Sequence, residues 1–421
     1  MNHAYNKVSV IGLGYIGLPT ATVLASKGIY VVGVDINQHA VDTINSGRIH
    51  IVEPDLDVIV HEVVKSGLLK ASTKPEPSDA FIIAVPTPFR GNHEPDMSYV
   101  EAAVKSIAPH LTKGNLIILE STSPVGSTEH VVNLLEQLRP DLVFPQQSDV
   151  NSDVQIAYCP ERVLPGHVLF ELVKNDRIIG GMTSKCSQAA VQLYKTFVEG
   201  ECVITNARTA EMSKLTENAF RDVNIAFANE LSLICDENGI DVWELIGLAN
   251  HHPRVNILKP GPGVGGHCIA VDPWFIVHSA PEQARMIRVA REVNDSKPYY
   301  VIEKVKRAVE SIKKLNPVIA CLGLSFKADI DDLRESPAVG ITKAILDHNA
   351  GRVLVVEPNI EKLPDSFNGK AVQLVELDEA LNQADILVVL VDHREFLGLA
   401  KMDLADKIIV DTRGIITVCR H

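Results

Sequence analysis

The stretch KVSVIGLGYIGLPTATVLASKGIYVVGVD, residues 7–35, decides the fold. Residues 7–12 and 30–34 are short apolar runs next to glycine and predict buried strands, while residues 15–27 predict a helix between them. A strand, a helix and a second strand within about 30 residues form a parallel βαβ unit. This unit predicts an α/β fold that begins with a Rossmann-like, doubly wound domain.

The same patterns organise the rest of the chain. Further strands are predicted at residues 80–85, 116–120, 318–323, 352–357, 386–391 and 407–411. Two long helices are predicted at residues 209–238 and 281–314, the second broken near Lys297–Pro298, with the Pro/Gly-rich loop 251–268 between them. The chain is therefore predicted to hold an N-terminal doubly wound domain (1–205), a central long-helix domain (206–314) and a smaller Rossmann-like domain (315–421).

The first strand leads into a glycine turn that predicts a dinucleotide site. The turn contains Gly12, Gly14 and Gly17 around Tyr15 and Ile16, and Asp35 ends the following strand. Glycines let the backbone approach a pyrophosphate at a helix N-terminus, and the acid accepts hydrogen bonds from ribose hydroxyls. A carboxylate repels a 2′-phosphate, so NAD is expected rather than NADP. A glycine turn without a ligand is the weaker alternative, because Asp35 completes the pattern.

Two later turns follow predicted strands, where ligands bind in open α/β sheets. Their hydroxyl side chains include Thr87, Thr122 and Thr128, which we expect to contact the cofactor. The alternative for Ser127 and Thr128 is that they only cap a helix, as such residues commonly do.

Composition excludes several classes of partner. The formal net charge is −13 and the charges are mixed along the chain, so nucleic acid and membrane surfaces are not expected partners. No apolar run approaches the roughly 20 residues of a membrane span, and the N-terminus does not read as a signal peptide. The seven cysteines are scattered without a CxxC pair, which indicates reduced thiols in the cytoplasm and no metal site.

Cys268 differs from the other cysteines because it follows a run of glycines, Gly263-Val264-Gly265-Gly266, and His267. Most free cysteines are small buried apolar residues. A thiolate beside an NAD site can instead attack an aldehyde, and oxidation of the adduct gives a thioester that water releases as an acid. Asp272 follows by four residues and would share a helical face with Cys268. We assign no catalytic role to His267.

Lys214, Asn218 and Arg221 are spaced to share one face of the first long helix. A solvated polar face is the plain alternative. Against it, the flanking residues are apolar, and a lysine with an asparagine can stabilise a developing oxyanion and accept the alcohol proton.

Seven motifs together resemble the UDP-glucose/UDP-N-acetylhexosamine 6-dehydrogenases over essentially the whole chain. They are GLGYIGLP (12–19), ESTSPVGST (120–128), YCPERVLPG (158–166), EMSKLTENAFRDVNIAFANE (211–230), HPRVNILKPGPGVGGHCIAVDP (252–273), GLSFKADIDDLRESPA (323–338) and VDTRG (410–414). The resemblance implies NAD as cofactor, no metal, a homodimer formed through the central helices, and a C-terminal UDP-binding domain. It also implies that the product supplies an acidic sugar for a surface polysaccharide.

The resemblance also implies roles for particular residues. Cys268 would be the nucleophile, Lys214 the proton acceptor, Asn218 and Asp272 its helpers with oxyanion and water, and Glu161 the residue that assists thioester hydrolysis. Substrate contacts would be made by Arg162, Val163, Lys214, Asn218, Arg221, His252, Arg254, Gly265, Phe326, Lys327 and Arg413. Arg334 would contact the cofactor, although an ion pair with a neighbouring acid is the alternative.

The substrate expectation follows from stretches that differ within this family. Residues 35–56 and 85–97 resemble the N-acetylhexosamine branch, and GHCIAVDP differs from the GSCF-type sequence of UDP-glucose enzymes. UDP-N-acetyl-D-mannosamine is therefore the expected substrate, with UDP-N-acetylglucosamine and UDP-glucose as alternatives.

Three other functions fit less of the sequence. A two-electron dehydrogenase of the 6-phosphogluconate or 3-hydroxyisobutyrate kind leaves Cys268 and the third domain without a role. A nucleotide-sugar sensor would not need the thiol or the lysine. A cysteine hydrolase gives no role to the glycine turn with Asp35.

Overall fold

The computed structural model describes residues 4–51, 53–91, 93–146, 151–163, 166–266, 268–312, 314–348 and 351–416, so His267 lies outside the described residues. The chain forms two compact units, Met1–Glu217 and Asn218–His421. The predicted boundaries of three domains stay a prediction. No helix among the described residues is both long and apolar enough to cross a membrane.

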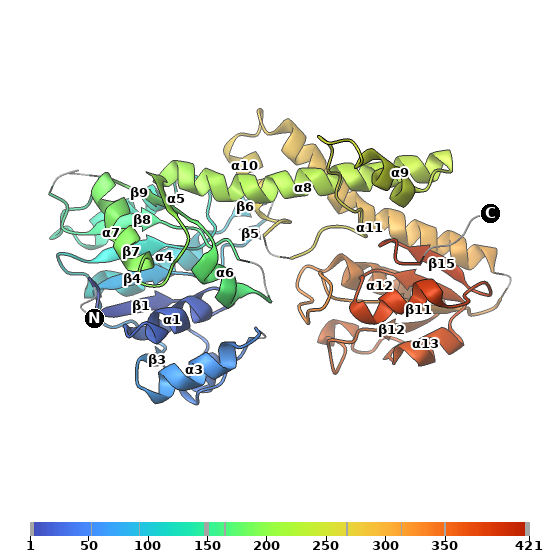
Figure 1. The fold of residues 1–421 in the computed structure, drawn as a ribbon, viewed down its shortest axis with the longest axis horizontal. Helices are drawn as coiled ribbons and strands as arrows, with labels where there is room; N and C mark the ends of the chain where they lie inside the picture. The colour runs from blue at the N-terminus through green and yellow to red at the C-terminus, as the bar shows by residue number, and fades with distance from the viewer. Residues whose placement is uncertain are drawn as a thin grey trace. The chain divides into compact units, whose positions relative to one another are not determined.

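The first unit is built on an eight-stranded sheet in the order β10-β9-β8-β7-β4-β1-β2-β3 (Figure 1). The strands are β1 (Lys7–Ile11), β2 (Tyr30–Val34), β3 (Leu69–Ser72), β4 (Ala80–Ile83), β7 (Leu116–Leu119), β8 (Gln155–Tyr158), β9 (Arg177–Gly181) and β10 (Cys202–Asn206), with a small hairpin of β5 (Phe89–Arg90) and β6 (Glu94–Pro95). All ladders of the large sheet are parallel except β8 with β9. The doubly wound α/β class is confirmed, and the antiparallel pair is a difference that the sequence pattern did not predict.

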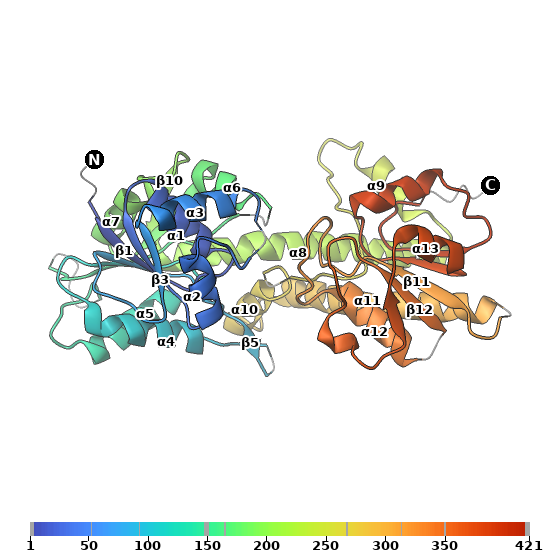
Figure 2. The same cartoon turned by 90° about the horizontal axis from the view of Figure 1, so that it is seen from below.

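Helices cover both faces of this sheet (Figure 2). They are α1 (Gly17–Ser26), α2 (Gln38–Asn45), α3 (Leu56–Lys65), α4 (Ser98–Ile107) with the 3-10 turn η1 (Ala108–His110), α5 (Ser127–Leu138), α6 (Val168–Lys174) and α7 (Ser184–Tyr194). Side chains of α1, α3, α6 and α7 form the core on one face, and those of α4 and α5 form it on the other. Because both faces are covered, the central strands are apolar throughout, as the short buried runs predicted.

The long helix α8 (Ala207–Asn238) starts in the first unit and continues into the second. The second unit continues with α9 (Val242–Ala249), α10 (Asp272–Ser279) and α11 (Arg285–Ser311). The predicted break near Lys297–Pro298 is wrong, since α11 continues through Pro298. Proline removes only one backbone hydrogen bond here, and the buried side chains of Asn294 and Val301 on either side hold the helix in the core.

The second sheet has five parallel strands in the order β13-β12-β11-β14-β15. Its strands are β11 (Val318–Leu322), β12 (Arg352–Val356), β13 (Val372–Leu374), β14 (Ile386–Val389) and β15 (Ile408–Asp411). Helices α12 (Pro337–Asp347) and α13 (Leu377–Gln383) and the 3-10 turns η2 (Asp365–Phe367) and η3 (Arg394–Lys401) complete it. Helices α11 and α12 pack on one face, and α13 and η3 on the other. This is the predicted smaller Rossmann-like fold.

In each of the two units, a similar glycine turn follows the first strand along the chain. The N–H of Gly12 donates to the Val34 carbonyl at 2.7 Å, and the N–H of Gly323 donates to the Val356 carbonyl at 2.8 Å. Both glycines have positive φ, 94° and 93°. An acid at the end of the second strand closes each turn, Asp35 in the first unit and Glu357 in the second.

Candidate active site

The glycine turn of the first unit has the shape that a dinucleotide needs. Gly12 has a positive φ, and a Cβ there would lie 2.5 Å from the Ala84 carbonyl oxygen. A Cβ on Gly17 would overlap the Gly12 carbonyl oxygen. At Gly14, by contrast, no heavy atom lies within 4 Å of the Cβ position, so the space beside the backbone is open. Since α1 begins at Gly17, this open space lies at a helix N-terminus, and a pyrophosphate fits there.

Asp35 connects this turn to the end of β2. Its Oδ2 accepts the Leu13 N–H at 2.9 Å, and its Oδ1 accepts the Asn37 N–H at 2.9 Å. Each carboxylate oxygen has two acceptor sites, so ribose hydroxyls can still bind. Tyr15 and Ile16 are half-buried beside the turn.

Asp35→Asn should weaken NAD binding roughly tenfold or more, because a hydrogen bond to a charged group is replaced by a neutral one. The amide oxygen can still accept the Leu13 N–H, while the bond from the Asn37 N–H is lost, and discrimination against NADP should relax. Titrations of both cofactors measure this. An unchanged NAD-to-NADP preference would place the ribose contact elsewhere.

The three threonines expected at the cofactor lie in different environments. The Thr87 hydroxyl donates to the Thr122 carbonyl, which ties the two turns together. Thr128 is fully buried, and its hydroxyl donates to Glu211 at 2.6 Å. Glu211 also accepts the Gly126 N–H at 2.6 Å, so a carboxylate from α8 caps the N-terminus of α5. Thr128 lies inside α5 and its hydroxyl bonds to Glu211 without capping the helix, so its contact with the cofactor stays a prediction.

Glu211 was not identified from the sequence. Burial raises the pKa of its carboxyl group, and the Thr128 hydroxyl and backbone N–H groups oppose that shift. Nothing in the sequence separation between Thr128 and Glu211 indicates that they meet.

Glu161 and Lys214 lie together in the first unit. Glu161 follows β8 and is buried, and burial raises its pKa, while the charges of Lys214 and Arg177 lower it. Lys214 is buried on α8. On the next turn of α8, Glu217 pairs with Arg162 at 2.9 Å. The Arg162–Glu217 ion pair and the attraction between the Glu161 and Lys214 charges therefore connect the Glu161–Arg162 segment to α8, and the half-buried Val163 follows it.

Asn218 and Asp272 lie together in the second unit. The Asn218 amide donates to the Asp272 carboxylate, and both side chains are buried. Cys268 is exposed just before α10, and the Asp272 N–H donates to the Cys268 carbonyl at 2.8 Å. This is the helical turn that the spacing of the two residues predicted. Arg221 lies on the helical row of Lys214 and Asn218, but its side chain is exposed.

The glycines before Cys268 lie against the segment between β11 and α12 of the same unit. A Cβ on Gly265 would lie 2.6 Å from the Glu335 carbonyl oxygen and 2.9 Å from the Phe326 Cβ. A Cβ on Gly266 would lie 3.0 Å from the Phe326 ring. The glycines therefore allow the cysteine loop to approach Phe326, which precedes the exposed Lys327.

The Pro/Gly-rich loop is also bonded to buried polar side chains of α8, which in turn bond to α11. Asn229 accepts the Gly261 N–H at 2.9 Å and donates to Asn294 at 2.8 Å. Asn294 and Arg291 of α11 both donate to the buried Asp222 of α8. None of these four side chains was singled out from the sequence, because a polar residue in a helix normally faces solvent.

Four predicted ligand contacts lie on the surface of the second unit. Arg413 pairs with Asp392 at 2.7 Å and reaches to within 2.7 Å of the Cβ position of Gly261. His252 and Arg254 are exposed at the start of the Pro/Gly-rich loop. Arg334 is exposed and its Nε lies 2.8 Å from Asp332, so the ion-pair alternative is present, and its contact with the cofactor stays a prediction.

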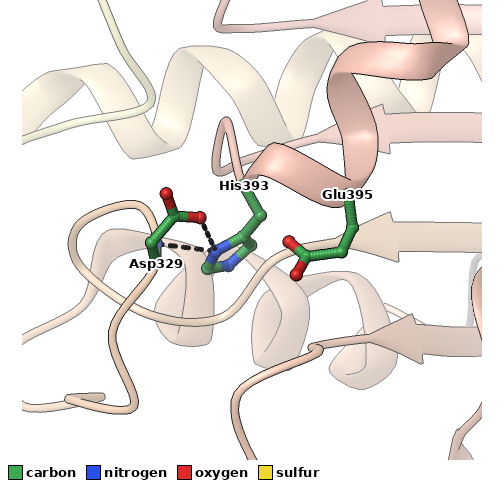
Figure 3. A group of neighbouring side chains, drawn as sticks. All are labelled: Asp329, His393 and Glu395. Atoms are coloured by element: carbon green, nitrogen blue, oxygen red, sulfur yellow. Dashed lines mark hydrogen bonds and ion pairs between the residues drawn. The ribbon is translucent and has the colours of Figure 1, made fainter.

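Asp329, His393 and Glu395 gather beside the second sheet, and Figure 3 shows the histidine between the two acids. The His393 ring is buried, and its Nδ1 accepts the Asp329 N–H at 3.0 Å. Its Nε2 lies 3.0 Å from Glu357. Both ring nitrogens are thus engaged within the protein, and we assign no metal to this group.

Three models of one family match the chain in order. They are the NAD-binding domain of the UDP-glucose/GDP-mannose dehydrogenase family at residues 6–198, its central domain at 208–296 and its UDP-binding domain at 320–418. The fold, the glycine turn and these matches define an NAD-dependent dehydrogenase with a separate nucleotide-binding domain.

Relatives match over nearly the full length. An NDP-N-acetyl-D-galactosaminuronic acid dehydrogenase of Ralstonia nicotianae is 64% identical over 98% of this chain and 96% of its own. A UDP-N-acetyl-D-mannosamine dehydrogenase of Escherichia coli K12 is 63% identical over 98% and 99%. The solved UDP-D-ManNAc dehydrogenase of Pyrococcus horikoshii is 40% identical over 98% and 96%, with a TM-score of 0.87. The chain belongs to the UDP-glucose/GDP-mannose dehydrogenase family.

Proposed function

We propose that this enzyme oxidises the C6 hydroxymethyl group of UDP-N-acetyl-D-mannosamine to a carboxylate, through a thiohemiacetal and a thioester on Cys268. The observation that carries the chemistry is the exposed Cys268 thiol at the helical turn that leads to the bonded Asn218–Asp272 pair. The sugar rests on the 63% identity to UDP-N-acetyl-D-mannosamine dehydrogenases. When bound, NAD supplies the electron acceptor for both oxidations.

Each residue of the site has one task in this proposal. Lys214 takes the hydroxyl proton in the first oxidation, and the Cys268 sulfur then adds to the aldehyde carbon. The Asn218 amide stabilises the oxyanion, and Asp272 orients that amide. Glu161 takes a proton from the water that cleaves the thioester.

The remaining predicted contacts are part of the same proposal. Sugar and nucleotide are held by Arg162, Val163, Arg221, His252, Arg254, Gly265, Phe326, Lys327 and Arg413. A lysine beside a diphosphate neutralises part of its charge, which is the physical reason for Lys327.

A second substrate is favoured by one observation. The galactosaminuronic acid dehydrogenase of Ralstonia nicotianae is as similar to this chain as the mannosamine enzymes are. Mannosamine and galactosamine sugars differ in ring stereochemistry, which is read by the shape of the pocket.

The test counts NADH formed per sugar consumed with the UDP derivatives of N-acetylmannosamine, N-acetylgalactosamine, N-acetylglucosamine and glucose. Two NADH per sugar, fastest with N-acetylmannosamine, supports the proposal. A faster rate with N-acetylgalactosamine overturns the substrate and keeps the chemistry. One NADH per sugar removes the thioester, and none with any sugar would favour a sensor.

The enzyme is further proposed to act in the cytoplasm as a homodimer. None of the six described cysteines is in a disulfide, which agrees with a reducing compartment. Three large apolar side chains of α8 repeat every seven residues and are 67%, 51% and 50% exposed: Phe220, Phe227 and Ile234. An apolar stripe of this spacing is typical of a helix that packs on another helix.

Phe227→Glu should therefore convert the dimer to monomers, because a carboxylate would be buried in the interface without a partner. Sedimentation of the purified protein over a range of concentrations measures this. Phe170→Glu is a matched control on α6, since Phe170 is 65% exposed outside the stripe. Identical sedimentation of both variants and the wild type would move the interface away from α8.

A further inference from the structure

Behind Glu161 lies a buried polar cluster that the proposed chemistry does not use. Its centre is the ion pair between Glu120 at the end of β7 and Arg177 at the start of β9. The distance from Arg177 Nη1 to Glu120 Oε1 is 3.4 Å, and the two side chains are 3% and 0% exposed. Burying two charges is costly, and apolar side chains of similar volume would often stabilise a fold as well. The pair is therefore a candidate for a functional role.

Neutral neighbours hold Glu120 in place. The Tyr194 hydroxyl donates to its Oε1 at 3.1 Å, and the Thr20 hydroxyl donates to its Oε2 at 3.4 Å. The Arg177 guanidinium also lies over the Tyr194 ring, 5.1 Å from its centroid. Cys159 is buried beside the same groups.

Arg177 and Glu161 each have one buried side-chain atom without a hydrogen bond in the described part of the chain. These atoms are the Arg177 Nη2 and the Glu161 Oε1. The charge of Arg177 lowers the pKa of Glu161, whereas the charge of Glu161 raises the pKa of Glu120. Burial is the larger influence on both acids, and it raises the pKa of Glu120 to about 7.

The four charged groups balance when all are ionised. Glu120 and Glu161 supply two negative charges, and Arg177 and Lys214 supply two positive charges. The other titratable groups facing them are the hydroxyl of Tyr194 and the thiols of Cys159 and Cys202. A proton that arrives on one carboxylate therefore changes the field at the other, because the medium between them has a low dielectric constant.

We propose that Glu120 and Arg177 form a positioning pair that sets the protonation state of Glu161 during thioester hydrolysis. The inference rests on the proposed function. In the step concerned, the water oxygen bonds to the thioester carbon, its proton passes to Glu161, and the C–S bond breaks to leave the Cys268 thiolate and the acid. Neither Glu120 nor Arg177 touches the reacting atoms.

The two partners act on Glu161 in opposite directions. Glu120→Gln removes a negative charge, so Arg177 acts more strongly on Glu161 and lowers its pKa. The hydrolysis rate falls at low pH as Glu161 becomes protonated. This fall, the acid limb of the pH–rate profile, should then move to lower pH by about one unit. Arg177→Met removes the positive charge and should move the same limb to higher pH by a similar amount, while Arg177→Lys keeps the charge and should leave the limb close to the wild-type position.

The experiment measures hydrolysis alone. The full-length enzyme is mixed with NAD and UDP-N-acetylmannosamine, quenched in acid at successive times, and the acyl-enzyme on Cys268 is followed by intact mass as a function of pH. NAD binding and thermal unfolding are measured on every variant. The proposal is supported if the wild type forms acyl-enzyme and if Glu120→Gln and Arg177→Met shift the acid limb of hydrolysis in opposite directions.

Two outcomes overturn it. If Glu120→Gln shifts nothing, or if both variants shift the limb in one direction, the cluster only supports the fold. If Arg177→Met does not fold, the double variant Glu120→Gln/Arg177→Met, which removes both charges, should return the limb toward its wild-type pH, and a failure to do so counts against the pair. If the wild type forms neither NADH nor acyl-enzyme with any UDP-sugar, the proposed function has failed instead.

Discussion

Cys268→Ser is expected to bind NAD normally and to form no acid. A serine hydroxyl ionises far less readily than a thiol, and its adduct with an aldehyde is a poorer route to an activated acyl group. Loss of the nucleophile should reduce turnover on the order of 10³-fold or more. The substitution leaves the residues of the glycine turn, where we place the pyrophosphate, unchanged, so NAD binding should be kept.

NADH formation and a calorimetric NAD titration on the same preparation measure both halves of this expectation. Cys321→Ser is a suitable control, because Cys321 is a buried cysteine on β11, outside the proposed site. Acid formation by Cys268→Ser at the wild-type rate would remove the thioester mechanism. A loss of NAD binding would show that the substitution had disturbed more than the thiol.

Gly17→Ala is expected to destabilise the first unit by about 3 kcal/mol or more, since the new methyl group would overlap the Gly12 carbonyl oxygen. The turn and the start of α1 must separate to accept it, so NAD binding should weaken as well. Chemical denaturation with and without NAD measures both effects.

Gly14→Ala is the matched control for this change. No heavy atom lies within 4 Å of its Cβ position, so its free energy of unfolding should stay within about 1 kcal/mol of the wild type. NAD binding should still weaken, because the methyl group would occupy the space where we place the pyrophosphate. Equal stability of the two variants would contradict the packing described for Gly17.

The sequence predicted most of the fold because apolar strands and glycine turns are local patterns. Strands β1, β2, β4 and β7 of the first sheet and β11, β12, β14 and β15 of the second were predicted from such runs, whereas β3, β8, β9, β10 and β13 were not. The antiparallel pairing of β8 with β9 was not predicted either, because the direction of a strand depends on the connection that precedes it. The continuity of α11 through Pro298 also depends on tertiary packing, which outweighs the local preference of proline.

For the candidate site, residues within one motif were predictable and pairs between motifs were not. The turn around Gly12 and the helical step from Cys268 to Asp272 follow from spacing. Glu211 is 83 residues from Thr128, and Arg177 is 57 residues from Glu120. No local pattern in the sequence links the members of either pair. The role of a buried charged residue can be predicted only when the residue that pairs with it is known.

The matching turns at Gly12 and Gly323 differ in what surrounds the acid that closes each of them. The acid that closes the first turn, Asp35, is only half-buried, whereas Glu357 is buried beneath the His393 ring. Hydrogen bonding to this imidazole and to backbone N–H groups overcomes the effect of burial and lowers the pKa of Glu357 to about 2. Asp35 is therefore accessible to a ligand, whereas the carboxylate of Glu357 is already occupied by His393 and by the backbone N–H groups of its own turn.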